Sequence, residues 1–114
     1  KIKKEWINVD IGPKSIKKFD EIIMLSKKIL WNGPMGIYEI DQYSVGTNHI
    51  ANSISNSTKN GSISLIGGGD SVAVVTKQKL KKQISFISSG GGALLSYLTN
   101  EKLDSIKNIN KLSL

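Results

Sequence analysis

One segment, residues 63–75, constrains the fold of this chain more than any other. A short run of isoleucine and leucine, typical of a buried strand, leads into Gly67, Gly68 and Gly69, and a small-residue apolar run that can form a helix follows. The unpaired N–H groups and the dipole at such a helix start favour an anion, and glycine lets a phosphate oxygen approach the backbone. Asp70 fits beside a bound phosphate if a divalent cation such as Mg²⁺ lies between the two anions. The alternative is a tight turn in which Asp70 is only the N-cap of the helix.

The composition narrows the class of protein. With 114 residues the chain has room for one compact domain, and the absence of cysteine excludes disulfides, thiolate metal sites and thiol nucleophiles. No apolar run approaches the length of a bilayer span, and no signal peptide is visible. We therefore expect a cytoplasmic protein without a membrane partner.

The net charge of +7 is compatible with a nucleic-acid partner, but other features argue against one. All 16 basic residues are lysine, so no arginine is present for bidentate contacts to guanine or phosphate. Aromatic residues make up only 6% of the chain, which leaves few platforms for base stacking. The lysines are also scattered in pairs, and we expect no nucleic acid among the partners.

The hydrophobic pattern predicts alternating strands and helices. The expected strands cover residues 6–11, 29–31, 62–66 and 84–88. The expected helices cover residues 15–27, 47–57, 70–79 and, as a short helix, 93–98. Residues 37–46 are ambiguous, and the last dozen residues are expected to form a tail. This order predicts an α/β fold: a three-layer, Rossmann-like parallel sheet with helices on both faces and right-handed crossovers.

Each expected strand leads into a glycine turn. The turns are Gly12-Pro13, Asn32-Gly33-Pro34, Gly67-Gly68-Gly69 and Gly90-Gly91-Gly92. In a parallel sheet all four turns lie at the carboxyl ends of the strands, the edge where open α/β sheets bind ligands. The pattern therefore favours a phosphate-bearing ligand at that edge.

Two common phosphate-binding motifs are absent. The chain contains no Gly-x-x-x-x-Gly-Lys-[Ser/Thr], and its triple glycines do not follow Gly-x-Gly-x-x-Gly. The single histidine, His49, lies in the helix expected over 47–57, and we expect it to have a surface or packing role rather than a catalytic one.

Three motifs, in their order and spacing, resemble the C-terminal part of phosphoglycerate kinase. They are Trp31-Asn32-Gly33-Pro34-Met35-Gly36-Ile37-Tyr38-Glu39, Gly67-Gly68-Gly69-Asp70-Ser71 and Ser89-Gly90-Gly91-Gly92-Ala93. Asp10-Ile11-Gly12-Pro13 and Gly46-Thr47 resemble further landmarks, so the resemblance spans almost the whole chain. The resemblance implies a glycolytic enzyme that transfers a phosphoryl group between ATP and 3-phosphoglycerate with Mg²⁺, giving ADP and 1,3-bisphosphoglycerate. It also implies two α/β domains, of which the C-terminal one holds the nucleotide.

The resemblance gives each matching residue an expected role. The expected nucleotide-binding residues are Asn32, Pro34, Glu39, Gly68, Gly69, Asp70 and Ser71. Glu39 would take the ribose hydroxyls, Pro34 would line the base, and Asn32 would reach toward the phosphates. Asp70 would be the metal ligand that orients Mg²⁺, and Ser71 would present its backbone N–H. Gly67 and Gly90 would be the catalytic main-chain donors that face the transferring phosphoryl group.

Some parts of a typical phosphoglycerate kinase chain have no counterpart in this sequence. The missing parts are the N-terminal domain, with the arginines and histidines that hold 3-phosphoglycerate, and the first strands of the nucleotide domain. Residues 1–114 are therefore expected to be the C-terminal portion of the nucleotide-binding domain, with an incomplete sheet and negligible kinase activity alone. In a full-length, monomeric enzyme 3-phosphoglycerate would bind through the missing domain. Two alternatives are a non-catalytic nucleotide-binding module and a basic nucleic-acid-binding protein.

Overall fold

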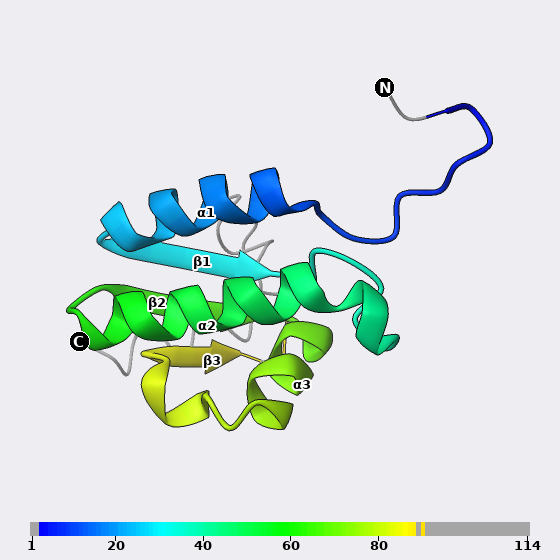
Figure 1. Ribbon diagram of the computed structural model, residues 1–114. Coiled ribbons are helices and arrows are strands. Elements are labelled where there is room, and N and C mark those ends of the chain that lie inside the picture. Colours follow the sequence, from blue (N-terminus) through cyan, green and yellow to red (C-terminus); the bar gives the residue numbers. More distant parts are fainter. Residues whose placement is uncertain (1–2, 89, 91–114) are drawn as a thin grey trace, which may run out of the picture.

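The computed structural model of the chain describes residues 3–88 and 90. In chain order its elements are the helix α1 (Pro13–Leu25), the strand β1 (Lys28–Asn32), the 3₁₀ helix η1 (Asp41–Tyr43), the helix α2 (Val45–Lys59), the strand β2 (Ile63–Gly67), the helix α3 (Gly69–Lys77), the 3₁₀ helix η2 (Lys81–Gln83) and the strand β3 (Phe86–Ser88). The strands form one parallel sheet in the order β1-β2-β3 (Figure 1). The predicted α/β class with an open parallel sheet is confirmed.

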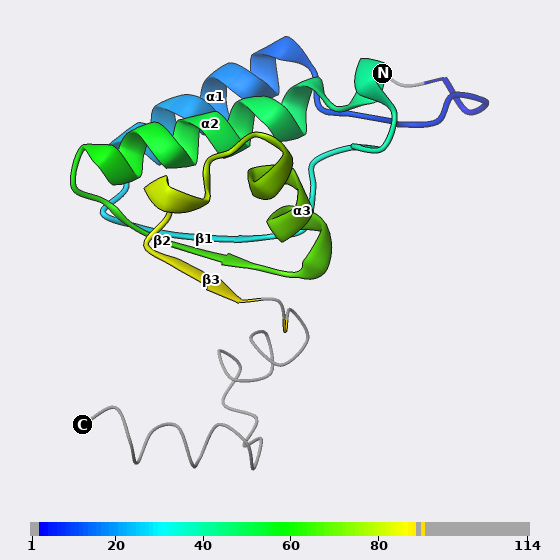
Figure 2. The ribbon, with the colours of Figure 1, turned by 90° about the horizontal axis from the view of Figure 1, so that it is seen from below.

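The described helices lie on one face of the sheet. Figure 2 shows α1, α2 and α3 together on one side of the three strands. On the other face the side chains of Leu30, Ile63 and Phe86 are 47%, 50% and 64% exposed. Apolar residues on both faces of parallel strands are typical of a sheet that is covered on both sides, as the three-layer prediction requires. The short helix predicted over 93–98 lies outside the described residues.

A cluster of buried apolar side chains joins α2 and α3 to the sheet. Its members are Trp31, Ile50, Ala51, Ile54, Ile66, Val74, Val75, Leu80 and Ile84. In α2 the buried positions 50, 51 and 54 recur at helical spacing, so one stripe of this helix faces the core. This core supports the ends of the strands from which the candidate site is built.

Helix α1 is the outermost described helix and packs on α2. Pro13 occupies its first turn, where the fixed φ of proline suits a helix start. The Ser57 hydroxyl of α2 donates a hydrogen bond of 3.0 Å to the carbonyl of Ile23 in α1. His49 Nε2 lies 3.6 Å from Asp20 Oδ1, and the His49 side chain is 48% exposed. The predicted surface role of His49 agrees with this position.

The strand predicted over residues 6–11 is wrong, because this segment is irregular. Trp6 and Ile7 are 64% and 84% exposed, so their apolar side chains are not buried against a neighbouring element. A strand needs a partner for its hydrogen-bond ladder, and here the Val9 carbonyl instead accepts one bond of 2.9 Å from the Ile37 N–H. The described fold therefore begins with α1, and the described part of the sheet has three strands rather than four.

The strands end at one level. Asn32 of β1 pairs with Gly67 of β2, and Gly67 pairs with Ser88 of β3. The starts of α1, α2 and α3 lie at the same end of the molecule as these strand ends (Figure 1). Two of the predicted glycine turns, after β1 and after β2, therefore meet at this edge. Within the described ranges no helix is long and apolar enough to span a membrane.

Candidate functional site

The turn between β2 and α3 is built from glycines that approach β1 closely. Gly68 has φ +89°, and a Cβ at this position would lie 2.8 Å from Asn32 Oδ1. The Gly68 N–H donates a bond of 3.1 Å to the Ser88 carbonyl, which fixes the turn against β3. Gly67, just before it, is buried at the end of β2. The backbone here follows a path that a side chain would strain.

The first turn of α3 presents backbone N–H groups to open space. The first main-chain bond of the helix runs from the Val72 N–H to the Gly68 carbonyl, at 3.1 Å. The N–H groups of Gly69, Asp70 and Ser71 therefore have no carbonyl partner within the helix. Among the residues that the structure describes, a Cβ built on Gly69 meets no atom within 4 Å. The space beside this helix start can therefore accept an anion.

Ser71 ties the helix to the turn after β1. Its side chain is fully buried, and its Oγ accepts a hydrogen bond of 2.8 Å from the Gly33 N–H. Gly33 has φ +101°, so the chain reverses sharply after β1. This bond uses the Ser71 hydroxyl for structure and leaves its backbone N–H for the predicted role.

The loop over residues 33–39 is held by hydrogen bonds to α2. Thr47, fully buried in the first turn of that helix, accepts hydrogen bonds at its Oγ1 from the N–H groups of Met35 and Gly36, at 3.0 and 3.3 Å. The bond from Met35 has an ordinary length and fixes the backbone of the loop, and the longer bond from Gly36 adds a weaker restraint. The loop that carries Pro34 and Glu39 is therefore anchored at its centre.

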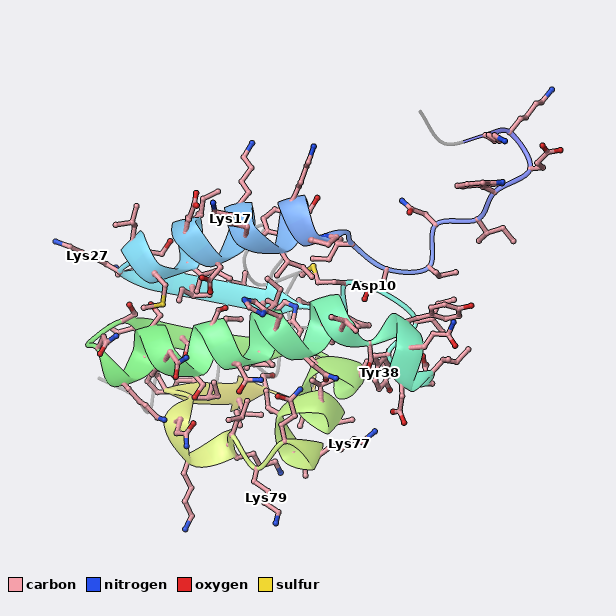
Figure 3. The ribbon with its side chains drawn as sticks, viewed as in Figure 1. Asp10, Lys17, Lys27, Tyr38, Lys77 and Lys79 are labelled. Atoms are coloured by element: carbon pink, nitrogen blue, oxygen red, sulfur yellow. The ribbon has the colours of Figure 1, made fainter. Side chains whose placement is uncertain are left out.

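Asp10 joins the segment before α1 to the start of α2, and its carboxylate lies close to Gly36 of the loop. Its Oδ2 accepts a hydrogen bond of 2.8 Å from the Gly46 N–H at the start of α2, where a negative charge is favoured. A Cβ on Gly36 would lie 2.6 Å from Asp10 Oδ1, and a Cβ on Gly46 would also collide with this carboxylate. Figure 3 shows Asp10 at the end of the molecule where Tyr38 also lies.

Tyr38 connects the loop to α3. Its hydroxyl donates a hydrogen bond of 3.0 Å to Asp70 Oδ1. This bond, then partial burial, and then the negative charges of Asp70 and Glu39 raise the pKa of Tyr38 above its usual value. Loop and helix are thus linked at the surface, above the buried link made by Ser71.

The remaining predicted residues lie around this centre. Glu39 is exposed beside Tyr38. Pro34 lines an open hollow of about 330 Å³ between the loop and the segment before α1. Its lining residues are Asn8, Val9, Asp10, Ile11, Pro34, Met35, Gly36 and Ile37. Gly90 is exposed, two residues beyond the end of β3.

Comparison with known proteins identifies the family. Residues 1–101 match the family model described as Phosphoglycerate kinase. The chain belongs to the phosphoglycerate kinase family. The phosphoglycerate kinase of Porphyromonas gingivalis is 48% identical over 102 residues, which make up 90% of this chain and 24% of that protein. The phosphoglycerate kinase of Corynebacterium aurimucosum is 49% identical over 104 residues, which make up 90% of this chain and 26% of that protein.

Solved structures of the family have the same fold. The crystal structure of phosphoglycerate kinase from Pyrococcus horikoshii matches with a TM-score of 0.79 and 35% identity, over 90% of this chain and 24% of that one. The structure of phosphoglycerate kinase from Coxiella burnetii matches with a TM-score of 0.77 and 37% identity, over 87% of this chain and 25% of that one. The chain spans about a quarter of the length of the phosphoglycerate kinases that it matches.

The structure brings together most of the residues that the phosphoglycerate kinase motifs singled out. Asn32 lies against Gly67 and Gly68, and Ser71 binds the N–H of Gly33, the residue after Asn32. Asp70 meets the loop through Tyr38. No contact with that cluster is described for Pro34, Glu39 or Gly90. These three residues lie at the same edge, beyond the carboxyl ends of the strands.

Sequence reasoning missed the roles of Asp10, Thr47 and Tyr38. All three stand in motifs that resemble phosphoglycerate kinase, and that was the available signal. Their partners lie 36, 12 or 11, and 32 residues away along the chain. A pattern within one helix or turn does not reveal such partners.

Proposed function

We propose that this chain supplies part of the nucleotide site of a phosphoglycerate kinase, which transfers a phosphoryl group between ATP and 3-phosphoglycerate. The observation that carries the proposal is the start of α3, where three N–H groups without helical partners border open space at Gly69. Family membership supports the choice of a nucleotide over other anions.

The phosphates of ADP or ATP would lie against Gly68, Gly69 and Ser71. The N–H groups there are held by the bond from Gly33 to the Ser71 hydroxyl, so they need little rearrangement when the nucleotide binds. Asn32 would meet the phosphates from the end of β1. On the loop Pro34 would line the base, and the exposed Glu39 would accept the ribose hydroxyls.

Asp70 fits the role of a Mg²⁺ ligand. Its carboxylate is exposed at the helix start, and a carboxylate is a preferred ligand of this hard cation. The described residues contain no group of three or more acidic, histidine or cysteine side chains that could hold a metal ion. Mg²⁺ commonly binds through one or two carboxylates together with phosphate oxygens and water, and this donor set matches that mode. Bound in this way, Mg²⁺ would neutralise charge on the phosphates.

Phosphoryl transfer depends on positioning and on charge stabilisation more than on covalent chemistry from the protein. Gly67, at the end of β2, and Gly90, two residues beyond the end of β3, are the proposed main-chain donors for the transferring group. The 3-phosphoglycerate would bind to parts of the enzyme that correspond to the uncovered three quarters of the relatives. Residues 1–114 would thus be the C-terminal portion of the nucleotide-binding domain, and the isolated chain would be inactive.

Calorimetric titration with ADP, with excess Mg²⁺ or with EDTA, tests the proposal. We expect weak binding by the chain, strengthened by Mg²⁺. Gly69→Ala places a methyl group where the phosphate would lie and should weaken binding under both conditions. Asp70→Ala should remove only the strengthening by Mg²⁺. Thr76→Ala, at an exposed position in the last turns of α3, is the matched control and should bind as the parent chain does.

Unchanged ADP binding by Gly69→Ala would contradict the proposed phosphate site, and unchanged Mg²⁺ dependence in Asp70→Ala would contradict the metal role. A coupled assay with ATP and 3-phosphoglycerate should show no turnover by the isolated chain. Robust turnover would contradict the proposal that 3-phosphoglycerate binds to other parts of the enzyme. Tight ADP binding by a stable, inactive monomer would favour the alternative of a non-catalytic nucleotide-binding module. The cytoplasmic location and the monomeric state of a full-length enzyme stay predictions.

A further inference from the structure

The hydrogen bond between Tyr38 and Asp70 joins two elements that the proposed site uses for different parts of the nucleotide. Tyr38 precedes Glu39 on the loop, and Asp70 lies in the first turn of α3. The bond spans 32 residues of sequence and is 3.0 Å long. It is a hydrogen bond between a hydroxyl group and a carboxylate, a class that is stronger than one between neutral groups.

The geometry leaves one carboxylate oxygen of Asp70 open. The Tyr38 hydroxyl contacts Oδ1, and among the described residues the carboxylate has no other hydrogen bond and no ion pair. An exposed aspartate can rotate about two side-chain bonds, and a bond at one oxygen restricts this rotation. The second oxygen therefore keeps a defined direction.

The ring of Tyr38 is itself held in place. It is one of the partly buried side chains that pack against the core cluster. Its backbone N–H donates a bond of 2.9 Å to the Gly36 carbonyl, within the loop that Thr47 anchors. The hydroxyl thus reaches Asp70 from a fixed support.

We propose that Tyr38 is a positioning residue for the Mg²⁺–nucleotide complex, because its hydroxyl holds the Asp70 carboxylate so that the second oxygen faces the cation. The inference rests on the proposed function. It adds a residue that touches neither the cation nor the nucleotide but acts through the carboxylate between them. Such partners of metal ligands commonly change metal affinity by about 10- to 100-fold when they are removed.

Tyr38→Phe is the test, because it removes the hydroxyl and keeps the ring that packs against the core. ADP affinity is measured by calorimetry with excess Mg²⁺ and with EDTA, on the full chain and on each variant. We expect Tyr38→Phe to lower the affinity for ADP with Mg²⁺ by roughly 10-fold and to leave the affinity in EDTA unchanged. Tyr43→Phe is the matched control: within the described part of the chain the Tyr43 hydroxyl has no hydrogen-bond partner, and we expect no effect.

The outcomes separate this inference from the function on which it rests. If the parent chain shows no effect of Mg²⁺ on ADP binding, the proposed metal role fails. If the parent chain depends on Mg²⁺ and Tyr38→Phe does so equally, the positioning role of Tyr38 is refuted. Equal losses with Mg²⁺ and with EDTA would also refute it, since they would show that the hydroxyl only supports the loop. Circular dichroism confirms that the variants remain folded.

Discussion

Replacement of Thr47 by valine should destabilise the chain through one lost acceptor. The side chain of Thr47 is fully buried, and its Oγ1 accepts the N–H groups of Met35 and Gly36. Valine has nearly the same shape but no acceptor, so both N–H groups lose their partner. A buried polar group left without a partner costs about 1–3 kcal/mol.

The structure sets the size of the effect. The bond from Gly36 is 3.3 Å long, slightly longer than the usual N–H···O range, and the bond from Met35 is 3.0 Å. Because Met35 and Gly36 are only half-buried, we expect Thr47→Val to lower the free energy of unfolding by about 1–3 kcal/mol in total. Thr47→Ser keeps the acceptor and removes one methyl group, which costs about 1 kcal/mol.

Urea denaturation followed by circular dichroism measures both variants against the parent chain. Thr47→Val should have the lower midpoint, with an unchanged slope if the change acts on the folded state alone. A valine variant as stable as the serine variant would refute the reasoning, because it would show that the two N–H groups find other partners. The same loop carries the proposed base and ribose contacts, so Thr47→Val should also weaken ADP binding.

Two further predictions concern the start of α3. Gly68→Ala should destabilise the chain by about 1–3 kcal/mol, because φ at this glycine is +89° and the new methyl group would push the side chain of Asn32 aside. Thermal unfolding measures this loss of stability. In the same experiment Gly69→Ala should destabilise the chain far less. Asp70→Asn should lower the pKa of Tyr38 toward its ordinary value of 10.0, since it removes the negative charge that favours the neutral phenol and leaves only an uncharged amide oxygen as acceptor. Ultraviolet titration of tyrosinate, with Tyr38→Phe as the reference, checks this shift, and an unchanged pKa would contradict the bond. The stabilisation from this bond should be present below pH 10 and lost as the pH rises through the raised pKa of Tyr38.

The elements predicted correctly were those in which local pattern and tertiary environment agree. The strands expected over 29–31 and 62–66 and the helix expected over 70–79 differ from β1, β2 and α3 by at most two residues at each end. Each has an apolar run or stripe that the core buries. The segment over 6–11 is also apolar, but a strand exists only where a second strand accepts its hydrogen bonds, and no local pattern contains that information.

The same distinction applies to the site. Gly67, Gly68 and Gly69 were predictable because a turn into a helix start is specified by neighbouring residues. The contact between Tyr38 and Asp70 depends on how the loop after β1 folds over α3, which is a property of the assembled fold. Sequence alone therefore predicted the glycine turn into α3 and missed the bond between Tyr38 and Asp70.

Asp10, Gly36 and Gly46 form a set of positions that cannot vary independently. A side chain at either glycine would displace the carboxylate, and loss of the carboxylate would leave the amide of Gly46 unmatched. The carboxylate belongs to the irregular segment before Pro13, so this segment packs against the loop over residues 33–39 and supports it. A design that grafts this loop and the start of α3 onto another scaffold would therefore have to include the segment before Pro13, although that segment forms no helix and no strand.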